Sequence, residues 1–270
     1  MTMRQDLYLE VDGARLRFRN DGAGPAVVLI HGWTLDLDMW GPQVAALADR
    51  FRMIRFDRRG FGLSTGRPSL KTDLADTRRL CAHMGVERAA FIGMSQGARV
   101  VAALAAAFPQ LVRCFVLDGA PVALAADGSL ASSELPLDEY RALVRSEGIE
   151  AFRRLWAGHP MTRLTTADPA AHALLARMLA RYRGDDLLEM PLAPAAAGQA
   201  LALESIGQPA LVLSGEFDLP NRRTAANEIA RRLGQGRSMQ VPNAGHLCNL
   251  DNPPAYNALL QDFLQQHAGA

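Results

Sequence analysis

The sequence AAFIGMSQGARVVAAL at residues 89–104 contains the feature that decides the fold, a Gly-x-Ser-x-Gly turn centred on Ser95. An apolar run enters the turn and a helix-forming run leaves it. A sharp strand-to-helix turn pushes the serine side chain out of the backbone, and the two glycines let neighbouring segments pack closely against it. The emerging helix points its N-terminal N–H groups toward the serine oxygen. The pattern therefore predicts that Ser95 is a catalytic nucleophile.

Apolar runs with the composition of buried strands alternate with helical segments along most of the chain. Strands are expected at 7–11, 14–19, 26–30, 51–56, 89–94, 112–117, 210–214 and 237–241. The first two alternate apolar with polar residues around Asp12-Gly13, which is typical of a hairpin with one solvated face. Buried strands that alternate with helices predict an α/β fold with a mostly parallel central sheet and helices on both faces. We expect the antiparallel hairpin at one edge of this sheet.

The region 121–206 interrupts this alternation. It is rich in Ala, Leu and Arg, is punctuated by prolines and contains no convincing strand. Short helices are expected near 137–146, 149–157 and 169–182. An insertion of this length is too long for a bare loop. We therefore predict a core domain formed by residues 1–120 and 207–270, with residues 121–206 as a helical cap, or lid, over the strand ends.

Polar side chains directly follow several of the predicted strands. Ligands bind beyond the carboxyl ends of the strands in such sheets, so these residues are expected to converge along one edge: His31, Asp57, Ser95, Asp118, Asp218 and His246. Ser95 needs a base to take its proton, and His246, in a glycine-bearing turn, is the best candidate. The histidine needs an acceptor to hold its tautomer, and Asp218 is favoured, with Asp118 as the alternative. The chain order of nucleophile, acid and base predicts a Ser–Asp–His triad.

Separate motifs in this order resemble those of α/β-hydrolases over essentially the whole chain. They are His31-Gly32-Trp33, DRRGFGLS at 57–64, the elbow at 93–97, Gly215-Glu216-Phe217-Asp218 and Gly245-His246. The resemblance implies that the backbone amides of Trp33 and Gln96 form an oxyanion hole. It also implies that His31, Asp57 and Arg59 are scaffold residues rather than catalytic ones.

The resemblance also narrows the chemistry. Haloalkane dehalogenases and epoxide hydrolases of this fold carry an aspartate at the elbow, whereas this chain has Ser95. The motif at 31–33, followed by Met39-Trp40, is similar to 3-oxoadipate enol-lactonases and related small esterases. We therefore predict a serine hydrolase that cleaves a small to medium carboxylic ester or lactone through an acyl-enzyme.

Other functions remain open, because this fold hosts several chemistries. A carbon–carbon bond hydrolase of the meta-cleavage-product type, acting on a vinylogous diketone, would use the same triad. A lyase or a cofactor-independent oxygenase is a further alternative. So is a ligand-binding receptor that kept the fold and lost turnover, although the intact Ser95, Asp218 and His246 favour an enzyme.

Side chains near the elbow and in the cap are the candidates for contact with the substrate. Those predicted to line the pocket are Trp33, Met94, Gln96, Trp156 and Met161. An apolar cap with methionines favours a largely apolar acyl or alcohol group. Other apolar cap residues serve either the substrate or the core of the cap, namely Phe152, Met178 and Met190. Three arginines are candidates for a substrate carboxylate, although a solvated helix face explains them better: Arg153, Arg154 and Arg163.

Composition narrows the partners. The 270-residue chain is 49% hydrophobic and 21% charged, with a formal net charge of +1. That balance gives no reason to expect nucleic acid or an anionic membrane as a partner, which leaves a small-molecule substrate, with a homodimer open. Cys81, Cys114 and Cys248 are widely spaced and odd in number, so we expect no disulfide framework. No His/Cys cluster has metal-ligand spacing, so we expect no metal, and the predicted hydrolytic cycle requires no organic cofactor. Without an apolar leader or a membrane-spanning run, we expect a cytoplasmic protein.

Overall fold

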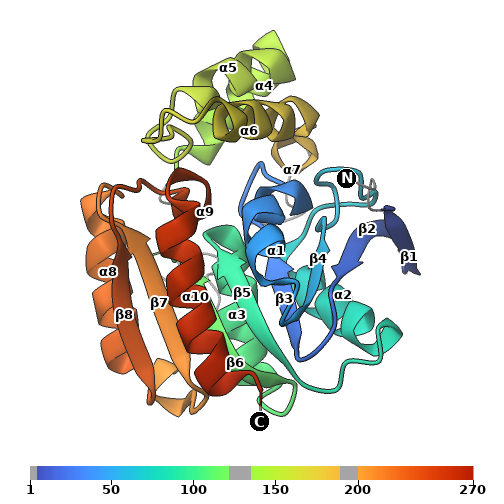
Figure 1. Ribbon diagram of the computed structural model, residues 1–270. Coiled ribbons are helices and arrows are strands. Elements are labelled where there is room, and N and C mark those ends of the chain that lie inside the picture. Colours follow the sequence, from blue (N-terminus) through green and yellow to red (C-terminus); the bar gives the residue numbers. More distant parts are fainter. Residues whose placement is uncertain (1–4, 122–134, 189–199, 270) are drawn as a thin grey trace.

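The computed structural model describes residues 5–121, 135–188 and 200–269. Its strands are β1 (Leu7–Val11), β2 (Ala14–Asp21), β3 (Ala26–Ile30), β4 (Arg52–Phe56), β5 (Ala89–Met94), β6 (Val112–Asp118), β7 (Ala210–Gly215) and β8 (Gly236–Val241). They form one eight-stranded sheet with the order β1-β2-β4-β3-β5-β6-β7-β8 (Figure 1). Strand β2 is antiparallel to β1 and β4, and all other neighbours are parallel. The predicted α/β fold, with a hairpin at the edge of a mostly parallel sheet, is confirmed.

Helices cover both faces of the sheet. One face carries α1 (Gly41–Leu47) and α10 (Pro253–His267), and the other carries α2 (Leu70–His83), α3 (Gln96–Ala107) and α8 (Pro220–Arg232). In Figure 1, α10 crosses in front of the strands and α3 lies behind them. Alternate residues of β3 belong to different buried clusters, Leu29 to that of α1 and Ile30 to that of α3. Because both faces are covered, β3 and β5 at the centre of the sheet are apolar throughout rather than alternating.

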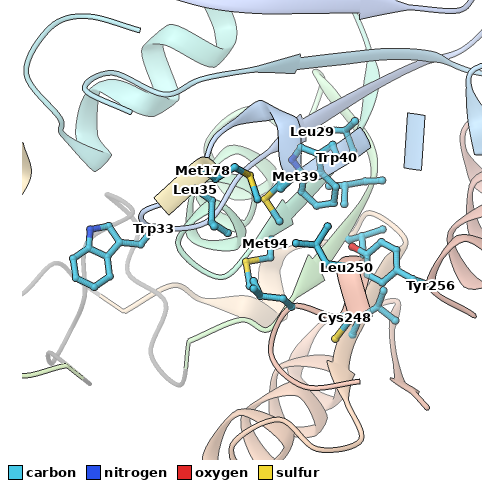
Figure 2. Packing of buried hydrophobic residues seen from close by; sticks show 14 of the residues in the cluster. Leu29, Trp33, Leu35, Met39, Trp40, Met94, Met178, Cys248, Leu250 and Tyr256 are labelled. Atoms are coloured by element: carbon cyan, nitrogen blue, oxygen red, sulfur yellow. The ribbon is translucent and has the colours of Figure 1, made fainter. Parts of the chain in front are cut away.

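The cluster on the α1 face continues to the carboxyl end of the sheet. Figure 2 shows Met94, at the end of β5, packed with Leu250 and Tyr256 from the C-terminal segment. Leu250 belongs to α9 (Cys248–Asp251), a short helix that the sequence did not predict. The core thus extends to the strand ends, where the polar residues singled out above are located.

A group of helices lies beyond the carboxyl ends of the strands, at the top of the view in Figure 1. It comprises α4 (Leu137–Glu147), α5 (Ile149–Ala157), α6 (Pro169–Arg181) and α7 (Asp185–Leu188). The first three match the predicted helices, whereas α7 was not predicted. Below, "the cap" means these helices and the segments that join them. The predicted limits of the cap domain, at 121 and 206, stay a prediction, because residues 122–134 and 189–199 lie outside the described part of the chain.

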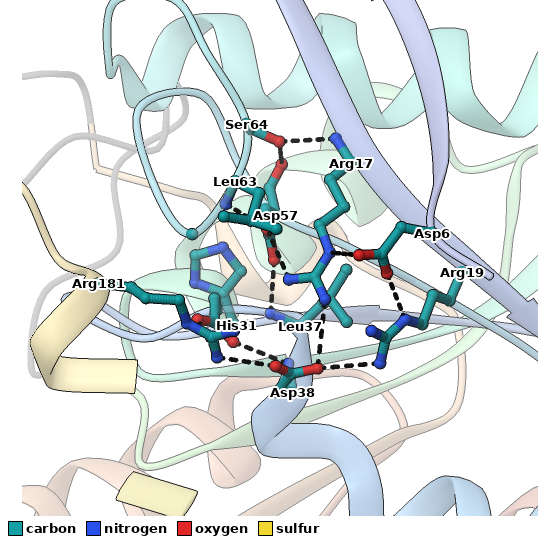
Figure 3. A network of polar contacts seen from close by, with 12 residues as sticks. Asp6, Arg17, Arg19, His31, Leu37, Asp38, Asp57, Leu63, Ser64 and Arg181 are labelled. Carbon is teal, nitrogen blue, oxygen red and sulfur yellow. Dashed lines mark hydrogen bonds and ion pairs between the residues drawn. The ribbon is translucent and has the colours of Figure 1, made fainter. Parts of the chain in front are cut away.

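Ion pairs and hydrogen bonds join the cap to the sheet domain. Arg181, at the end of α6, lies 2.7 Å from a carboxylate oxygen of Asp38 (Figure 3). It also lies 2.8 Å from a carboxylate oxygen of Asp36. Arg183 donates to the carbonyl oxygens of Gly62 at 2.8 Å and Ser64 at 2.9 Å. The cap is therefore attached at two places, at the start of the 3-10 helix η1 (Leu37–Trp40), where Asp36 is the N-cap, and at the loop after β4.

The loop after β4 is itself built around a buried carboxylate. Asp57 Oδ1 accepts from the backbone N–H of Leu37, and Oδ2 accepts from that of Leu63, both at 2.8 Å. Arg17 lies 3.3 Å from the same carboxylate (Figure 3). Arg59 pairs with Asp76 and does not line the cavity described below. The scaffold roles expected for Asp57 and Arg59 are confirmed by these contacts.

Within the described residues, no helix combines the length and the apolar character that crossing a bilayer requires.

Candidate active site

Ser95 lies between β5 and α3, with φ +50° and ψ −109°. A Cβ atom on Gly93 would lie 2.4 Å from the carbonyl oxygen of Gly97, and one on Gly97 would lie 2.3 Å from that of Ile30. Such contacts with backbone atoms cannot be relieved by a side-chain rotation, so both positions require glycine. The Ser95 N–H donates to the carbonyl oxygen of Asp118 at 2.7 Å. The expected strand-to-helix elbow is therefore present, with a positive φ at its serine.

His246 lies in the turn after β8, and Asp218 lies in the turn after β7. His246 Nδ1 is 3.0 and 3.1 Å from the two carboxylate oxygens of Asp218, and both side chains are buried. Because an ionised carboxylate only accepts hydrogen bonds, Nδ1 carries a proton and Nε2 is left as the acceptor of the neutral ring. The structure therefore brings together the histidine and the aspartate that the sequence paired.

Ser95 and His246 line the same cavity. His246 Nε2 is buried and has no hydrogen-bond partner among the described residues, so the hydroxyl of Ser95 does not yet bond to it. Catalytic hydrogen bonds are often long or poorly aligned before substrate binds. The arrangement offers an unoccupied acceptor nitrogen at the cavity that also contains the serine.

Asp118, the alternative acid, ends β6 but is not the carboxylate bonded to His246. Burial, and then the charge of Asp218, raise the pKa of Asp118 to about 8, although Tyr256 and Cys248 beside it oppose this rise. A protonated carboxyl at that place does not stabilise an imidazolium as an ionised one does. The contacts favour Asp218 as the partner of the histidine.

The oxyanion donors predicted from the resemblance are the backbone amides of Trp33 and Gln96. Trp33 follows β3, and Gln96 is the first residue of α3. Neither N–H has an acceptor within the described ranges, so both are available to a ligand. An N–H at the start of a helix is also the positive end of the helix dipole. Their role as an oxyanion hole stays a prediction.

His31 is a structural residue, as expected. Its Nε2 accepts from the backbone N–H of Arg58 at 2.9 Å, and its Nδ1 therefore donates to the carbonyl oxygen of Gly32 at 2.7 Å. The ring is fully buried, and burial, followed by the charge of Arg58, lowers its pKa well below the usual value. A neutral ring with both nitrogens engaged is not a general base.

The cavity beside Ser95 has a volume of about 140 Å³. All the predicted contact residues line it: Trp33, Met94, Gln96, Trp156 and Met161. Polar groups that the sequence analysis did not single out also line it: Arg99, Arg141, Arg222 and Asp186. Across the described ranges, no group of three or more His, Cys, Asp or Glu side chains is arranged to hold a metal ion.

The arginines proposed from the sequence lie elsewhere. Arg153 donates to the carbonyl oxygen of Tyr182, at 2.6 Å from Nη2, while Arg154 and Arg163 are exposed and do not line the cavity. The favoured interpretation, a solvated helix face, agrees with Arg154 on α5, whereas Arg163 is exposed in the segment between α5 and α6. Phe152 and Met178 are buried in the core cluster and do not line the cavity either. Met190 lies outside the described residues.

Asp186, in α7, is held by two donors at the cavity. Trp33 Nε1 donates to one carboxylate oxygen at 2.6 Å, and the Tyr182 hydroxyl donates to the other at 2.6 Å. Burial raises the pKa of this carboxyl, and the two donors oppose that rise. No sequence signal marks Asp186, because α7 is only four residues long and lies in an insertion without a strong pattern.

The comparisons agree with this architecture. The family model described as alpha/beta hydrolase fold matches residues 25–253. An esterase from Thermogutta terrifontis has a TM-score of 0.82 at 24% identity, covering 98% of this chain and 100% of that one. The enol-lactonase from Burkholderia xenovorans LB400 has a TM-score of 0.79 at 27% identity, covering 96% and 100%.

A curated relative points to a different chemistry. A Bacillus subtilis protein with the provisional name 2-succinyl-6-hydroxy-2,4-cyclohexadiene-1-carboxylate synthase is 26% identical, over 94% of this chain and 96% of its own length. The chain is thus similar to an esterase and an enol-lactonase in structure and, in sequence, to a protein provisionally named as a synthase. The reaction has to be argued from the site.

Proposed function

The chain belongs to this family, the alpha/beta hydrolase fold, and from that premise we propose that it is a serine hydrolase acting on a small to medium carboxylic ester or lactone. One observation carries the proposal. His246, whose Nδ1 is held by Asp218, lines the same cavity as Ser95 on its elbow. In this proposal Ser95 is the nucleophile, His246 the general base and Asp218 the residue that orients the ring.

The acylation step uses the vacant nitrogen of the histidine. As Ser95 Oγ attacks the substrate carbonyl carbon, His246 Nε2 takes the hydroxyl proton, and the buried carboxylate of Asp218 stabilises the resulting imidazolium. The carbonyl oxygen becomes negatively charged and accepts from the amides of Trp33 and Gln96. Removing one such donor typically costs about 3–4 kcal/mol of barrier.

Collapse of the tetrahedral intermediate completes the cycle. His246 returns its proton to the leaving alkoxide oxygen, which departs as an alcohol, or stays tethered to the acyl group when the substrate is a lactone. Water, deprotonated by the same nitrogen, then attacks the acyl carbon; the bond to Ser95 Oγ breaks, Oγ takes the proton back from His246, and the carboxylic acid leaves. These steps require no metal ion and no organic cofactor.

The lining of the cavity supports a substrate with an apolar body and an acidic end. Met94, Trp156 and Met161 supply apolar walls. Arg141 of α4 supplies positive charge, because its ion-pair partner Asp138 is exposed and can be replaced by a substrate carboxylate; Arg99 and Arg222 also line the cavity. A guanidinium binds a carboxylate with two parallel hydrogen bonds. We therefore include a free carboxylate in the proposed substrate.

Replacement of the nucleophile tests the proposal. Ser95→Ala should reduce turnover of p-nitrophenyl acyl esters about 10⁴-fold or more, with an unchanged unfolding transition. Ser146→Ala is the matched control, because Ser146 is exposed on α4 and does not line the cavity. A Ser95→Ala variant that keeps wild-type turnover would overturn the proposal.

A substrate panel separates the competing reactions. Esters of graded acyl length, a lactone and a dienoate diketone should be given to the same enzyme preparation. We expect turnover of esters or lactones. Cleavage of the dienoate alone would replace the proposal with carbon–carbon bond hydrolysis. Binding of these compounds without turnover would instead indicate that the protein is a ligand-binding receptor.

A further inference from the structure

Residues 31–36, which follow β3, carry one of the two proposed oxyanion donors, and we name them the oxyanion loop. The core holds the start of this loop, because Arg58 bonds both to His31 and, at 3.2 Å, to the carbonyl oxygen of Gly32. The core also holds its end, because Asp57 accepts from the N–H of Leu37 directly after the loop. Neither of these attachments reaches the side chains in the middle of the loop.

The cap holds the middle of the oxyanion loop. The indole of Trp33 donates to Asp186 of α7 at 2.6 Å, and the indole of Trp156 in α5 donates to the hydroxyl of Thr34 at 2.8 Å. Both acceptor and donor on the cap side belong to side chains, so the contacts depend on those residues. Two adjacent loop residues are thus bonded to two different cap helices.

Aromatic packing also attaches the oxyanion loop to the cap. The ring centroid of Trp33 lies 4.8 Å from Trp156, 5.6 Å from Phe152, 6.0 Å from Tyr182 and 6.2 Å from Tyr140. All of these partners belong to the cap. Figure 2 shows the Trp33 ring pointing away from the labelled core side chains. Without the cap the ring would lose its aromatic partners and its acceptor together.

Thr34 shows why the loop needs this support. Its φ is +63°, a left-handed conformation that a β-branched residue rarely adopts. Such a conformation is unfavourable and persists only where the surroundings impose it. The side chain is 1% exposed, and its hydroxyl is the acceptor for Trp156. The cap contact therefore opposes relaxation of the peptide next to the Trp33 amide.

We propose that Asp186 and Trp156 are positioning residues that couple the cap to the oxyanion hole, by clamping Trp33 and Thr34 so that the Trp33 N–H meets the developing oxyanion. The inference rests on the proposed function, since it assigns these residues to its transition state. A donor displaced by about 1 Å loses much of its effect on the transition state while substrate binding is little changed. Loss of the clamp should therefore lower kcat and leave KM nearly constant.

Asp186 permits a substitution that keeps the clamp. Asn retains a carbonyl oxygen that accepts from the Trp33 indole, whereas Leu retains the size without an acceptor. Burial raises the pKa of Asp186, and a protonated carboxyl likewise keeps an acceptor oxygen for the indole. Asp186→Asn should therefore stay within about threefold of wild-type kcat, while Asp186→Leu should lose about tenfold or more.

The discriminating measurement uses a matched pair of inhibitors. Ser95 Oγ adds to the carbonyl carbon of a trifluoromethyl ketone, His246 takes the serine proton, and the former carbonyl oxygen becomes an oxyanion in the hole. The parent methyl ketone binds in the cavity but forms no covalent bond to Ser95. Asp186→Leu should weaken the trifluoromethyl ketone in parallel with kcat/KM and leave the methyl ketone within threefold. Equal affinity of both inhibitors for the variant and the wild type would overturn the inference.

Trp156→Phe tests the other half of the clamp if Asp186→Leu fails to fold. It keeps an aromatic ring but removes the N–H that bonds to Thr34. Trp40→Phe is its control, because the Trp40 Nε1 is buried without a partner in the described part of the chain. Asp185→Leu is the control for Asp186, since its carboxylate pairs with Arg183 instead. Loss of kcat in both controls, equal to that in the test variants, would contradict the clamp.

The outcomes for the two proposals are distinct. If the wild type forms no covalent adduct with the trifluoromethyl ketone at Ser95, the proposed function fails. If the wild type forms the adduct and Asp186→Leu and Trp156→Phe form it with the same affinity, only the clamp fails.

Discussion

Ser95 has a positive φ, a backbone conformation that most residues avoid. The chain on either side of it packs so closely against neighbouring backbone that the turn is fixed. Its φ is +50°, and the flanking Gly93 and Gly97 touch backbone atoms that a Cβ would overlap. Stored strain of this kind persists where packing over-determines it. The position of the serine hydroxyl therefore depends on two residues that carry no functional group.

Gly97→Ala tests this dependence. The new Cβ would lie 2.3 Å from the carbonyl oxygen of Ile30 and 2.7 Å from that of His31, so α3 must shift away from β3. We expect the free energy of unfolding to fall by about 1–3 kcal/mol and kcat to fall with it. Gly41→Ala is the control, since nothing lies within 4 Å of its Cβ position. Denaturant titration of both variants measures the difference, and an unchanged Gly97→Ala protein would contradict the packing argument.

Asp118→Asn tests the buried carboxyl behind the triad. The folded protein holds the pKa of Asp118 at about 8, above the usual 3.8, mainly because the group is buried. Between these values the unfolded chain has released the proton and the folded chain retains it, so Asp118 makes stability fall as pH rises from about 4 to 8. The slope is at most about 1.4 kcal/mol per pH unit.

The variant removes this slope. Relative to the wild type, Asp118→Asn should gain stability as the pH rises from 4 to 8, as measured by denaturant titration at each pH. A constant difference between the two proteins over that range would show that Asp118 is ionised in the folded state.

At the scale of single residues, the sequence predicted those whose chemistry is tied to a local motif. Ser95, Asp218 and His246 each follow a strand in a recognisable turn, and the structure brings them to one region. Asp186 and Arg141 have no such motif. Their place at the cavity depends on how cap helices pack onto the sheet, which local patterns do not encode.

At the scale of elements, α4 presents one arginine to the cavity and the next to solvent. Arg141 lines the cavity and pairs with Asp138 at 2.7 Å, whereas Arg145, one turn later, is exposed and does not line it. Side chains four residues apart share a helix face but lie about 6 Å apart along its axis, so only one meets the pocket.

Arg141→Gln should therefore weaken binding of acidic substrates alone. For an ester that ends in a free carboxylate, we expect KM to rise about tenfold, which corresponds to about 1.4 kcal/mol. For the same ester with that carboxylate methylated, KM should stay within twofold, and Arg145→Gln should change neither. Equal effects on both esters would exclude Arg141 as a carboxylate ligand.

The helices and strands with strong periodicity were predicted with nearly correct limits. The predicted helix at 149–157 is α5, and the predicted strand at 26–30 is β3. The short helices α7 and α9, of four residues each, escaped prediction because one turn does not establish a period. The residues of the clamp therefore lie partly in an element that only tertiary packing reveals.

At the scale of the whole molecule, an ion pair between Arg181 of the cap and the buried Asp36 joins the cap to the domain that contains the sheet. Asp36 is 1% exposed and lies 2.8 Å from Arg181. Burial, and then the charge of Asp57, raise the pKa of Asp36 to about 7, which Arg181 opposes. Above pH 7 the ionised carboxylate depends on this arginine from the cap.

Arg181→Gln should loosen the cap more at alkaline than at acidic pH. We expect a loss of about 1–3 kcal/mol at pH 8, less than a fully buried pair would lose because the Arg181 side chain is 28% exposed. The loss should shrink toward pH 5, where Asp36 is protonated. Amide hydrogen exchange should quicken in 137–188, and Arg177→Gln, an exposed change on the same helix, should leave it unaltered. A pH-independent loss would contradict the role of Asp36.

The most direct test of the central claim is the rate at which a fluorophosphonate captures Ser95, followed by intact mass and peptide mapping. The wild type should gain one phosphonyl group on Ser95, because His246 takes the hydroxyl proton as fluoride leaves. His246→Gln should react at least about 100-fold more slowly than the wild type. Capture at another residue, or equal rates in the wild type and His246→Gln, would contradict the proposal that these two residues form a working pair.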